Sequence, residues 1–179
     1  MHETDFDFTG LQTGLLKALQ EGTSQECIAQ FALVGGAVRD WLLSQELGDQ
    51  NQNVFDWDFV VEGAADKLAS HVLAQIEPRR LERYQLHKAY GTVELKVDGI
   101  CIDLATARTE RYKEPGTNPI IIPSQLEKDL ERRDFTVNAM ALVLPELCLI
   151  DHHKGQEALS KRLLIFLHSR SVAEDPTRV

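Results

Sequence analysis

The strongest constraint on the fold is a hairpin signal in the middle of the chain. The stretch GTVELKVDGICIDLATA, residues 91–107, contains two runs of alternating apolar and polar residues on either side of Asp98-Gly99. Asp-Gly between two such runs is typical of a tight antiparallel turn. Because alternate strand residues share a face, Asp103 lies on the face opposite to that of Ile102. We therefore expect an antiparallel pair of strands with one apolar face.

Helical and strand patterns alternate along the rest of the chain. A helix is expected over 9–20, where Thr9 and Gln12 form a capping-box pattern, and QFALVGG predicts a short buried strand ending in two glycines. The further expectations are a helix over 37–47 that ends at Gly48, a strand over 53–63, a helix after Gly63, a long loop over 108–123, a helix capped by Ser124 and Glu127 that breaks near Asp134, a hairpin over 141–151, a helix over 155–162, a strand over 163–167 and the start of a helix over 171–179. Together they predict an α+β fold with one mixed sheet flanked by helices.

Composition narrows the class of protein. The chain has 179 residues, of which 43% are hydrophobic and 26% charged, as is ordinary for one globular domain. A net charge of −9 disfavours a nucleic-acid-binding surface that covers the whole protein. It allows a local basic patch, or an acidic site that binds phosphates through metal ions. Cys27, Cys101 and Cys148 lack CxxC spacing, which favours free, buried thiols in a reducing compartment. With no membrane-spanning run and no targeting peptide recognised, a cytoplasmic location is expected.

Two aspartates in an apolar run form the first candidate site. In NVFDWDFVVEG, residues 53–63, Asp56 and Asp58 share one face of the expected strand, and Trp57 points to the other. Like charges so close repel each other, so the pair indicates either a solvated strand end or a bound cation. Asp103 is either a polar residue on a half-exposed strand or a third carboxylate beside them. Three such carboxylates would suit two Mg²⁺ ions and phosphoryl or nucleotidyl transfer.

A double glycine before a helix forms the second candidate site. In LVGGAVRD, Gly35 and Gly36 end a strand and precede a helix N-terminus, where backbone amides and the helix dipole favour a phosphate. The same pair is also typical of a tight turn without a ligand. It matches neither the dinucleotide fingerprint GxGxxG nor the phosphate loop GxxxxGK[ST].

Five motifs then occur in order: LVGGAVRD, DWDFVVEG, IDLATARTERY, LERRDFTVNAMAL and EDPTR. In order and spacing they resemble the class II tRNA nucleotidyltransferase and bacterial poly(A) polymerase family, one of the polymerase-β-like nucleotidyltransferases. The resemblance runs from about Phe31 to the last residue. It implies a polymerase-β-like catalytic head over residues 1–168 and the start of a truncated helical neck over residues 169–179.

The resemblance also implies roles for individual residues. Asp56 and Asp58 resemble the family's catalytic, metal-binding pair, with Mg²⁺ as the cofactor. Asp175 and Arg178 match the pair that reads the base edge of ATP or CTP, and Asp acceptors with a fixed fork of Arg donors suit that task. The positions similar to nucleotide-binding residues of the family are Gly35, Gly36, Arg39, Arg133, Asp134, Asp175 and Arg178. Asp103 is not carried by the resemblance, and its candidate catalytic role is inferred from its place on the neighbouring strand.

The implied function is template-independent addition of C and/or A from CTP or ATP to the 3′ end of tRNA, with release of pyrophosphate. The implied partners are the RNA 3′ end and the nucleotides, without a membrane and without an obligatory protein partner. A poly(A) polymerase of the same family is an alternative. A non-catalytic RNA-binding module is a third, and the intact carboxylates argue against it. Family members that add CC alone tend to lack the segment corresponding to residues 108–123, so its presence favours CCA or A addition.

Overall fold

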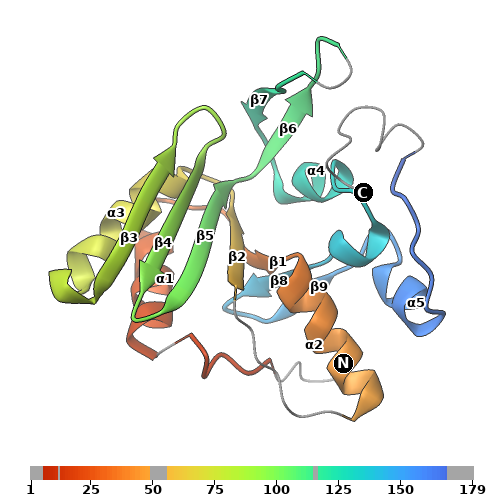
Figure 1. Ribbon diagram of the computed structural model, residues 1–179, viewed down its shortest axis with the longest axis horizontal. Helices are drawn as coiled ribbons and strands as arrows, with labels where there is room; N and C mark the ends of the chain where they lie inside the picture. The colour runs from red at the N-terminus through yellow and green to blue at the C-terminus, as the bar shows by residue number, and fades with distance from the viewer. Residues whose placement is uncertain (1–5, 12, 49–55, 115–116, 169–179) are drawn as a thin grey trace.

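A computed structural model describes residues 6–11, 13–48, 56–114 and 117–168. A seven-stranded mixed sheet runs through the molecule in the order β3-β4-β5-β2-β1-β8-β9, and a two-stranded sheet, β6-β7, stands beyond the end of β5 (Figure 1). The strands are β1 (Phe31–Val34), β2 (Asp56–Val61), β3 (Leu81–His87), β4 (Thr92–Val97), β5 (Ile100–Thr106), β6 (Arg108–Arg111), β7 (Ile120–Pro123), β8 (Ala141–Leu144) and β9 (Cys148–Ile150). The helices are α1 (Thr13–Gln25), α2 (Gly36–Leu47), α3 (Ala65–Gln75), α4 (Leu126–Glu131) and α5 (Gly155–Ser160), with 3-10 turns η1 (Pro78–Arg80) and η2 (Thr136–Asn138). The α+β fold with one main mixed sheet is confirmed.

The two predicted hairpins and the predicted glycine turns are present. β4 and β5 pair antiparallel, and Asp98 and Gly99 between them have φ of 49° and 80°. Positive φ at both central residues is what a type I′ hairpin turn requires. β8 and β9 form the second hairpin. α2 follows β1 directly and ends at Gly48, whose φ of 67° closes the helix in the left-handed region.

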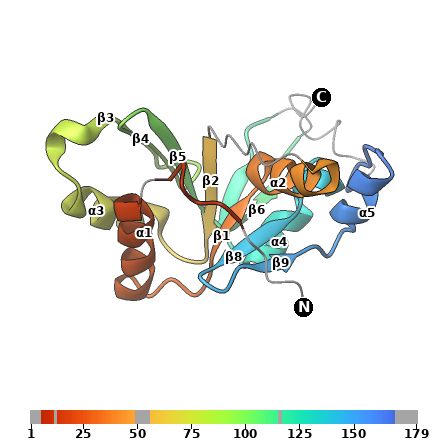
Figure 2. The same cartoon turned by 90° about the horizontal axis from the view of Figure 1, so that it is seen from below.

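Helices cover the two faces of the sheet unequally. Large apolar side chains of α1, α2 and α3, among them Leu15, Trp41 and Leu68, pack with Trp57 and Ile102 in one extensive core on a single face. A smaller cluster joins α4 to the opposite face of β1, β2 and β8. Figure 2 shows α1 and α3 side by side at the end of the molecule opposite α5. β1 is buried along its whole length because it lies between both clusters.

Three expectations about the extent of helices, strands and loops are wrong. The segment 108–123, expected as a long loop, contains β6 and β7, which pair antiparallel with Arg108 opposite Pro123. The strand expected over 163–167 reduces, in the described part of the chain, to one isolated bridge between Phe135 and Phe166. The first helix begins at Thr13 rather than near Thr9, whose hydroxyl donates a hydrogen bond to Asp7 Oδ2 at 3.0 Å.

The cysteine and membrane expectations have different outcomes. All three cysteines are free thiols, but Cys27 and Cys148 are exposed and Cys101 is half-buried, so the expectation of buried thiols is wrong. No helix within the described residues is both long and apolar enough to cross a bilayer. The neck expected over 169–179 lies outside the described residues.

The N-terminus of α4 is capped by a residue distant in the sequence. Ser124 and Glu127 were expected to form a capping box, but the helix begins at Leu126 without a capping bond from its own N-cap side chain. Instead, Glu62 Oε1 accepts a hydrogen bond of 2.6 Å from the backbone N–H of Leu126. Glu62 directly follows β2, so the bond fixes α4 against the central strands.

Removal of this cap should destabilise the protein measurably. We expect Glu62→Ala to lower the free energy of unfolding by about 1 kcal/mol, as for other helix caps, because the Leu126 amide loses its acceptor. Ser124→Ala should change it by much less, because the N-cap position is that of Gln125 and the Ser124 side chain has no hydrogen bond within the described residues. Urea unfolding of both variants checks the contrast, and an equal loss in both would contradict it.

Candidate active site

The three candidate carboxylates lie on neighbouring strands and on one face of the sheet. β2 and β5 run parallel, with Asp58 paired with Asp103 and Asp56 paired with Cys101. Trp57 points to the opposite face, where its side chain is only 1% exposed among the core aromatics. The expected common face of Asp56 and Asp58 is therefore present, and Asp103 stands next to it.

Mutual repulsion and loss of hydration make this face favourable for a cation. Partial burial raises the pKa of the Asp58 carboxyl, the Arg133 guanidinium opposes the shift, and Asp56 raises the pKa further. Loss of hydration raises the pKa of Asp103 to about 6, and the charges of Asp58, Glu94 and Asp56 add to this effect. In both cases the folded protein disfavours the ionised carboxylate, which a bound cation would compensate.

The carboxylates on this face suit Mg²⁺ better than they suit a metal ion that is coordinated by protein side chains alone. Within the described residues, no group of three His, Cys, Asp or Glu side chains is gathered closely enough to hold an ion by itself. Mg²⁺ is commonly bound by one or two carboxylates that are completed by water and substrate phosphates. The half-buried Asp58 and the exposed Asp56 offer carboxylate oxygens of this kind.

Gly35 brings backbone close to the Asp58 carboxylate. Its φ of 70° and ψ of −135° lie in a region where the backbone of any residue other than glycine is strained. A Cβ at this position would stand 3.5 Å from Asp58 Oδ2 and 3.6 Å from Arg133 Nη1. The turn between β1 and α2 thus leaves space beside an acidic and a basic group, at the N-terminus of a helix.

Asn138, which the sequence analysis did not single out, links three of the predicted residues. Its Oδ1 accepts a hydrogen bond of 2.8 Å from Arg39 Nη1, and its Nδ2 donates one of 3.3 Å to Asp134 Oδ1. Its backbone carbonyl lies 3.4 Å from Arg133 Nη1 as an acceptor. Asn138 belongs to the stretch RRDFTVNAM, five residues after Arg133, where the local pattern does not mark it as a site residue.

Comparison with known proteins places the chain in a family. The family model of the poly(A) polymerase head domain matches residues 31–165. The chain belongs to this family. The resemblance recognised in the five motifs is thereby confirmed.

Two relatives of the chain are tRNA nucleotidyltransferases. The chain is 40% identical over 152 residues to the A-adding tRNA nucleotidyltransferase of Aquifex aeolicus, covering 82% of this chain and 17% of that protein. It is 40% identical over 157 residues to the CC-adding tRNA nucleotidyltransferase of Deinococcus radiodurans, covering 84% of this chain and 38% of that protein. The chain thus spans well under half the length of these relatives.

Solved structures show the same head. A CCA-adding enzyme in apo form II superposes with a TM-score of 0.74 at 35% identity, over 97% of this chain and 38% of that one. A tRNA nucleotidyltransferase in complex with a primer tRNA and an incoming ATP analogue gives a TM-score of 0.69 at 32% identity, over 90% of this chain and 42% of that one. The polymerase-β-like fold class expected from the sequence is confirmed.

In this family member, most of the predicted site residues lie together. Gly35 and Arg133 adjoin Asp58, while Arg39 and Asp134 meet at Asn138. A Cβ on Gly36 would stand 3.6 Å from Arg39 Nη2. Asp175 and Arg178 lie outside the described residues.

The raised pKa of Asp103 predicts a pH-dependent stability. A folded-state pKa of about 6, above the ordinary 3.8, means that the folded protein binds this proton more tightly than the unfolded chain. The resulting stability is complete below pH ~4 and is lost as the pH rises through about 6. Asp103→Asn should therefore stabilise the metal-free protein at pH 7 and should have little effect near pH 4. We expect a gain of only about 1 kcal/mol at pH 7, because the Asp103 side chain is only partly buried and solvent screens its charge. Urea unfolding in EDTA at several pH values checks this, and a gain that does not vary with pH would contradict it.

Proposed function

We propose that this chain is the catalytic head of an RNA nucleotidyltransferase that adds C and/or A from CTP or ATP to the 3′ end of tRNA. The observation that carries the proposal is the Asp56/Asp58 pair beside Gly35 and Arg133 in a chain of this family. Metal-binding carboxylates, a backbone turn open to phosphate and a guanidinium are together the parts that nucleotidyl transfer requires.

In the proposed mechanism, the chain's own residues bind and orient the nucleotide. Gly35 admits the phosphates to the backbone amides at the start of α2, where the helix dipole favours negative charge. Arg133 offers guanidinium donors to a phosphate oxygen. Asp134 accepts a hydrogen bond from Asn138, and we place the ribose of the nucleotide near this pair. Mg²⁺, held by Asp56 and Asp58 with Asp103 alongside, would supply activation of the attacking 3′-hydroxyl and neutralisation of the leaving pyrophosphate.

The substrate assignment is supported by the relatives. They include A-adding, CC-adding and CCA-adding enzymes, and one structural neighbour is a CCA-adding enzyme complexed with tRNA. For this reason we favour tRNA over poly(A) synthesis. We further propose that residues 1–168 form the head and 169–179 begin a helical neck with Asp175 and Arg178 at the base edge. We also propose that the enzyme is cytoplasmic and requires no obligatory protein partner.

Transfer to defined tRNA ends tests the function. The complete natural protein is incubated with MgCl₂, labelled CTP or ATP, and tRNAs that end before CCA, after C or after CC. We expect extension that stops at the mature CCA end, and the combination of primer and nucleotide that reacts identifies the C- and A-adding activities. Long A tails on any RNA would instead indicate a poly(A) polymerase. Binding of tRNA without incorporation of either nucleotide would indicate the non-catalytic module.

A further inference from the structure

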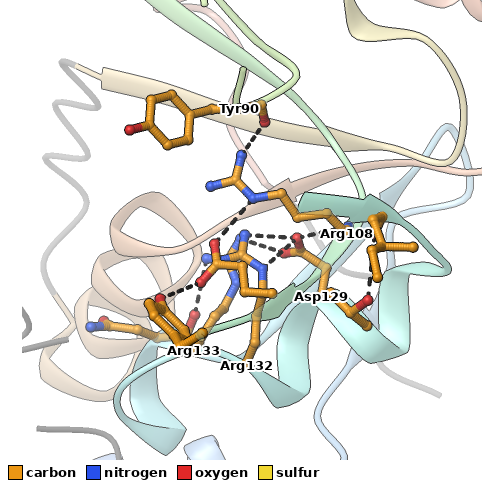
Figure 3. Close-up of polar contacts among 10 residues, drawn as sticks. Tyr90, Arg108, Asp129, Arg132 and Arg133 are labelled. Carbon is orange, nitrogen blue, oxygen red and sulfur yellow. Dashed lines mark hydrogen bonds and ion pairs between the residues drawn. The ribbon is translucent and has the colours of Figure 1, made fainter. Parts of the chain in front are cut away.

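A fully buried carboxylate contacts Arg133 of the candidate site. Asp129, in α4, has no solvent-exposed surface. Figure 3 shows the side chains of Arg132 and Arg133 converging on it, with Arg108 beside them. A buried charge is costly unless it is paired and hydrogen-bonded, so each of its contacts matters for the fold and for the orientation of the partners.

Both oxygens of Asp129 are used. Oδ1 accepts hydrogen bonds from Arg132 Nε at 3.0 Å and Nη2 at 2.8 Å, and from the backbone N–H of Arg108 at 3.2 Å. Oδ2 accepts one of 3.1 Å from Arg133 Nη2. Because three bonds from two other groups hold the carboxylate, Oδ2 is a fixed anchor for the Arg133 guanidinium.

Arg132 is occupied by protein groups on its other side as well. Its Nη1 donates to Glu110 Oε1 at 2.9 Å, and the same oxygen accepts from Arg108 Nε at 3.2 Å. Tyr112 donates its hydroxyl to Glu110 Oε2 at 2.8 Å, and Arg108 Nη1 donates to the backbone carbonyl of Tyr90. Arg132 therefore links α4 to β6.

Ion pairs link the members of this cluster. In the described residues, the guanidinium groups of Arg108, Arg132 and Arg133 meet the carboxylates of Asp129 and Glu110. Arg133 is the member nearest the catalytic face, where it opposes the raised pKa of Asp58 and adjoins Gly35. Arg133 thus connects the buried Asp129 carboxylate with the place where an incoming phosphate would lie.

We infer that Asp129 is a positioning residue for nucleotide binding: it holds Arg133 through Oδ2 while Arg132 and the Arg108 amide hold Oδ1. This inference rests on the nucleotide-binding role proposed above for Arg133. Pre-organisation is valuable here because an arginine on a long flexible side chain otherwise loses conformational freedom when it binds a phosphate. Asp129 itself touches neither substrate nor metal in this arrangement.

A double-mutant cycle between Asp129 and Arg133 tests the inference. In the complete natural protein, Asp129→Asn should raise the KM for ATP or CTP by about tenfold to a hundredfold, as expected for loss of a charge-assisted hydrogen bond, with the KM for the RNA primer unchanged. In an Arg133→Met background, Asp129→Asn should have almost no further effect on the nucleotide KM, because the group through which it acts is gone. Glu131→Gln is the matched control: it removes an exposed carboxylate of the same helix, whose partner is Lys128, and should leave all constants unchanged.

The outcomes separate the inference from the proposed function. If Asp129→Asn weakens nucleotide binding equally with and without Arg133, its role is structural and the inference is overturned. If the wild-type protein and Glu131→Gln neither bind nor transfer nucleotides, the proposed function fails and the inference fails with it. If Asp129→Asn does not fold, as judged by circular dichroism, Asp129→Glu keeps the charge but displaces its oxygens. The same cycle with that variant should show a smaller rise in nucleotide KM, again only when Arg133 is present.

Discussion

Replacement of Asp58 by asparagine should lower the rate of nucleotide transfer by about a thousandfold or more and, at the same time, stabilise the metal-free protein. The loss of activity follows because the variant loses a carboxylate ligand that neutral amide oxygen replaces poorly. The gain in stability follows because the raised pKa of Asp58 shows that its ionised form is disfavoured in the folded state. The kcat at saturating MgCl₂ and the Tm in EDTA measure the two effects.

The opposite signs of these effects distinguish a functional carboxylate from a structural one. A structural carboxylate would lose stability together with activity when it is replaced. Asp56→Asn should lower activity in the same way, because Asp56 shares the face with Asp58. Asp66→Asn serves as the control, since it removes an exposed carboxylate from the first turn of α3 and should change transfer by less than about twofold. A normal rate of nucleotide transfer by Asp58→Asn in the presence of MgCl₂ would contradict the assignment of the metal-binding pair.

The parts of the fold that the sequence predicted depend on local chemistry. Asp98-Gly99 fixes a type I′ turn through residues that tolerate positive φ, so the β4–β5 hairpin needs no distant partner to be recognised. Strand alternation alone places Asp56 and Asp58 on one face and Trp57 on the other. The glycines after Val34 likewise mark the passage from β1 to α2 within a few residues.

The parts that could not be predicted depend on contacts between distant segments. β6 and β7 are short strands separated by a segment rich in charge, Gly and Pro, and their pairing gives little local signal. The cap of α4 comes from Glu62, which lies 64 residues earlier in the chain. Arg132 carries the sequence signature of an exposed helix charge, yet its environment is set by Glu110 from another element.

Two residues of the site, Asn138 and Asp129, likewise depend on contacts between distant segments. Asn138 gains its place in the site through Arg39, 99 residues away, so its importance lies in tertiary structure rather than in the pattern of its own segment. Asp129 shows only a helical position in the sequence, whereas the structure buries it completely between guanidinium groups. Residues with direct chemistry were recognisable, and those that orient them were not.

Gly35→Ala should lower kcat/KM for the nucleotide by about a hundredfold and destabilise the protein by about 1–3 kcal/mol. The backbone at φ 70° and ψ −135° strains any residue with a Cβ. The new methyl group would also stand between Asp58 and Arg133, at 3.5 Å from the first and 3.6 Å from the second. These distances are ordinary contacts, so the methyl group would fit the metal-free protein while narrowing the approach of a phosphate to the backbone. Urea unfolding and steady-state kinetics measure the two losses.

Gly99→Ala separates strain from obstruction. Gly99 has a φ of 80°, and a Cβ there would meet no atom within 4 Å, so this variant carries backbone strain in the β4–β5 turn without occupying the site. It should lose stability to a similar extent and retain normal nucleotide KM and kcat. If both glycine variants lose activity in proportion to stability, the space at Gly35 has no special role. If only Gly35→Ala loses nucleotide binding, the absence of a side chain between Asp58 and Arg133 is itself a functional requirement of the turn.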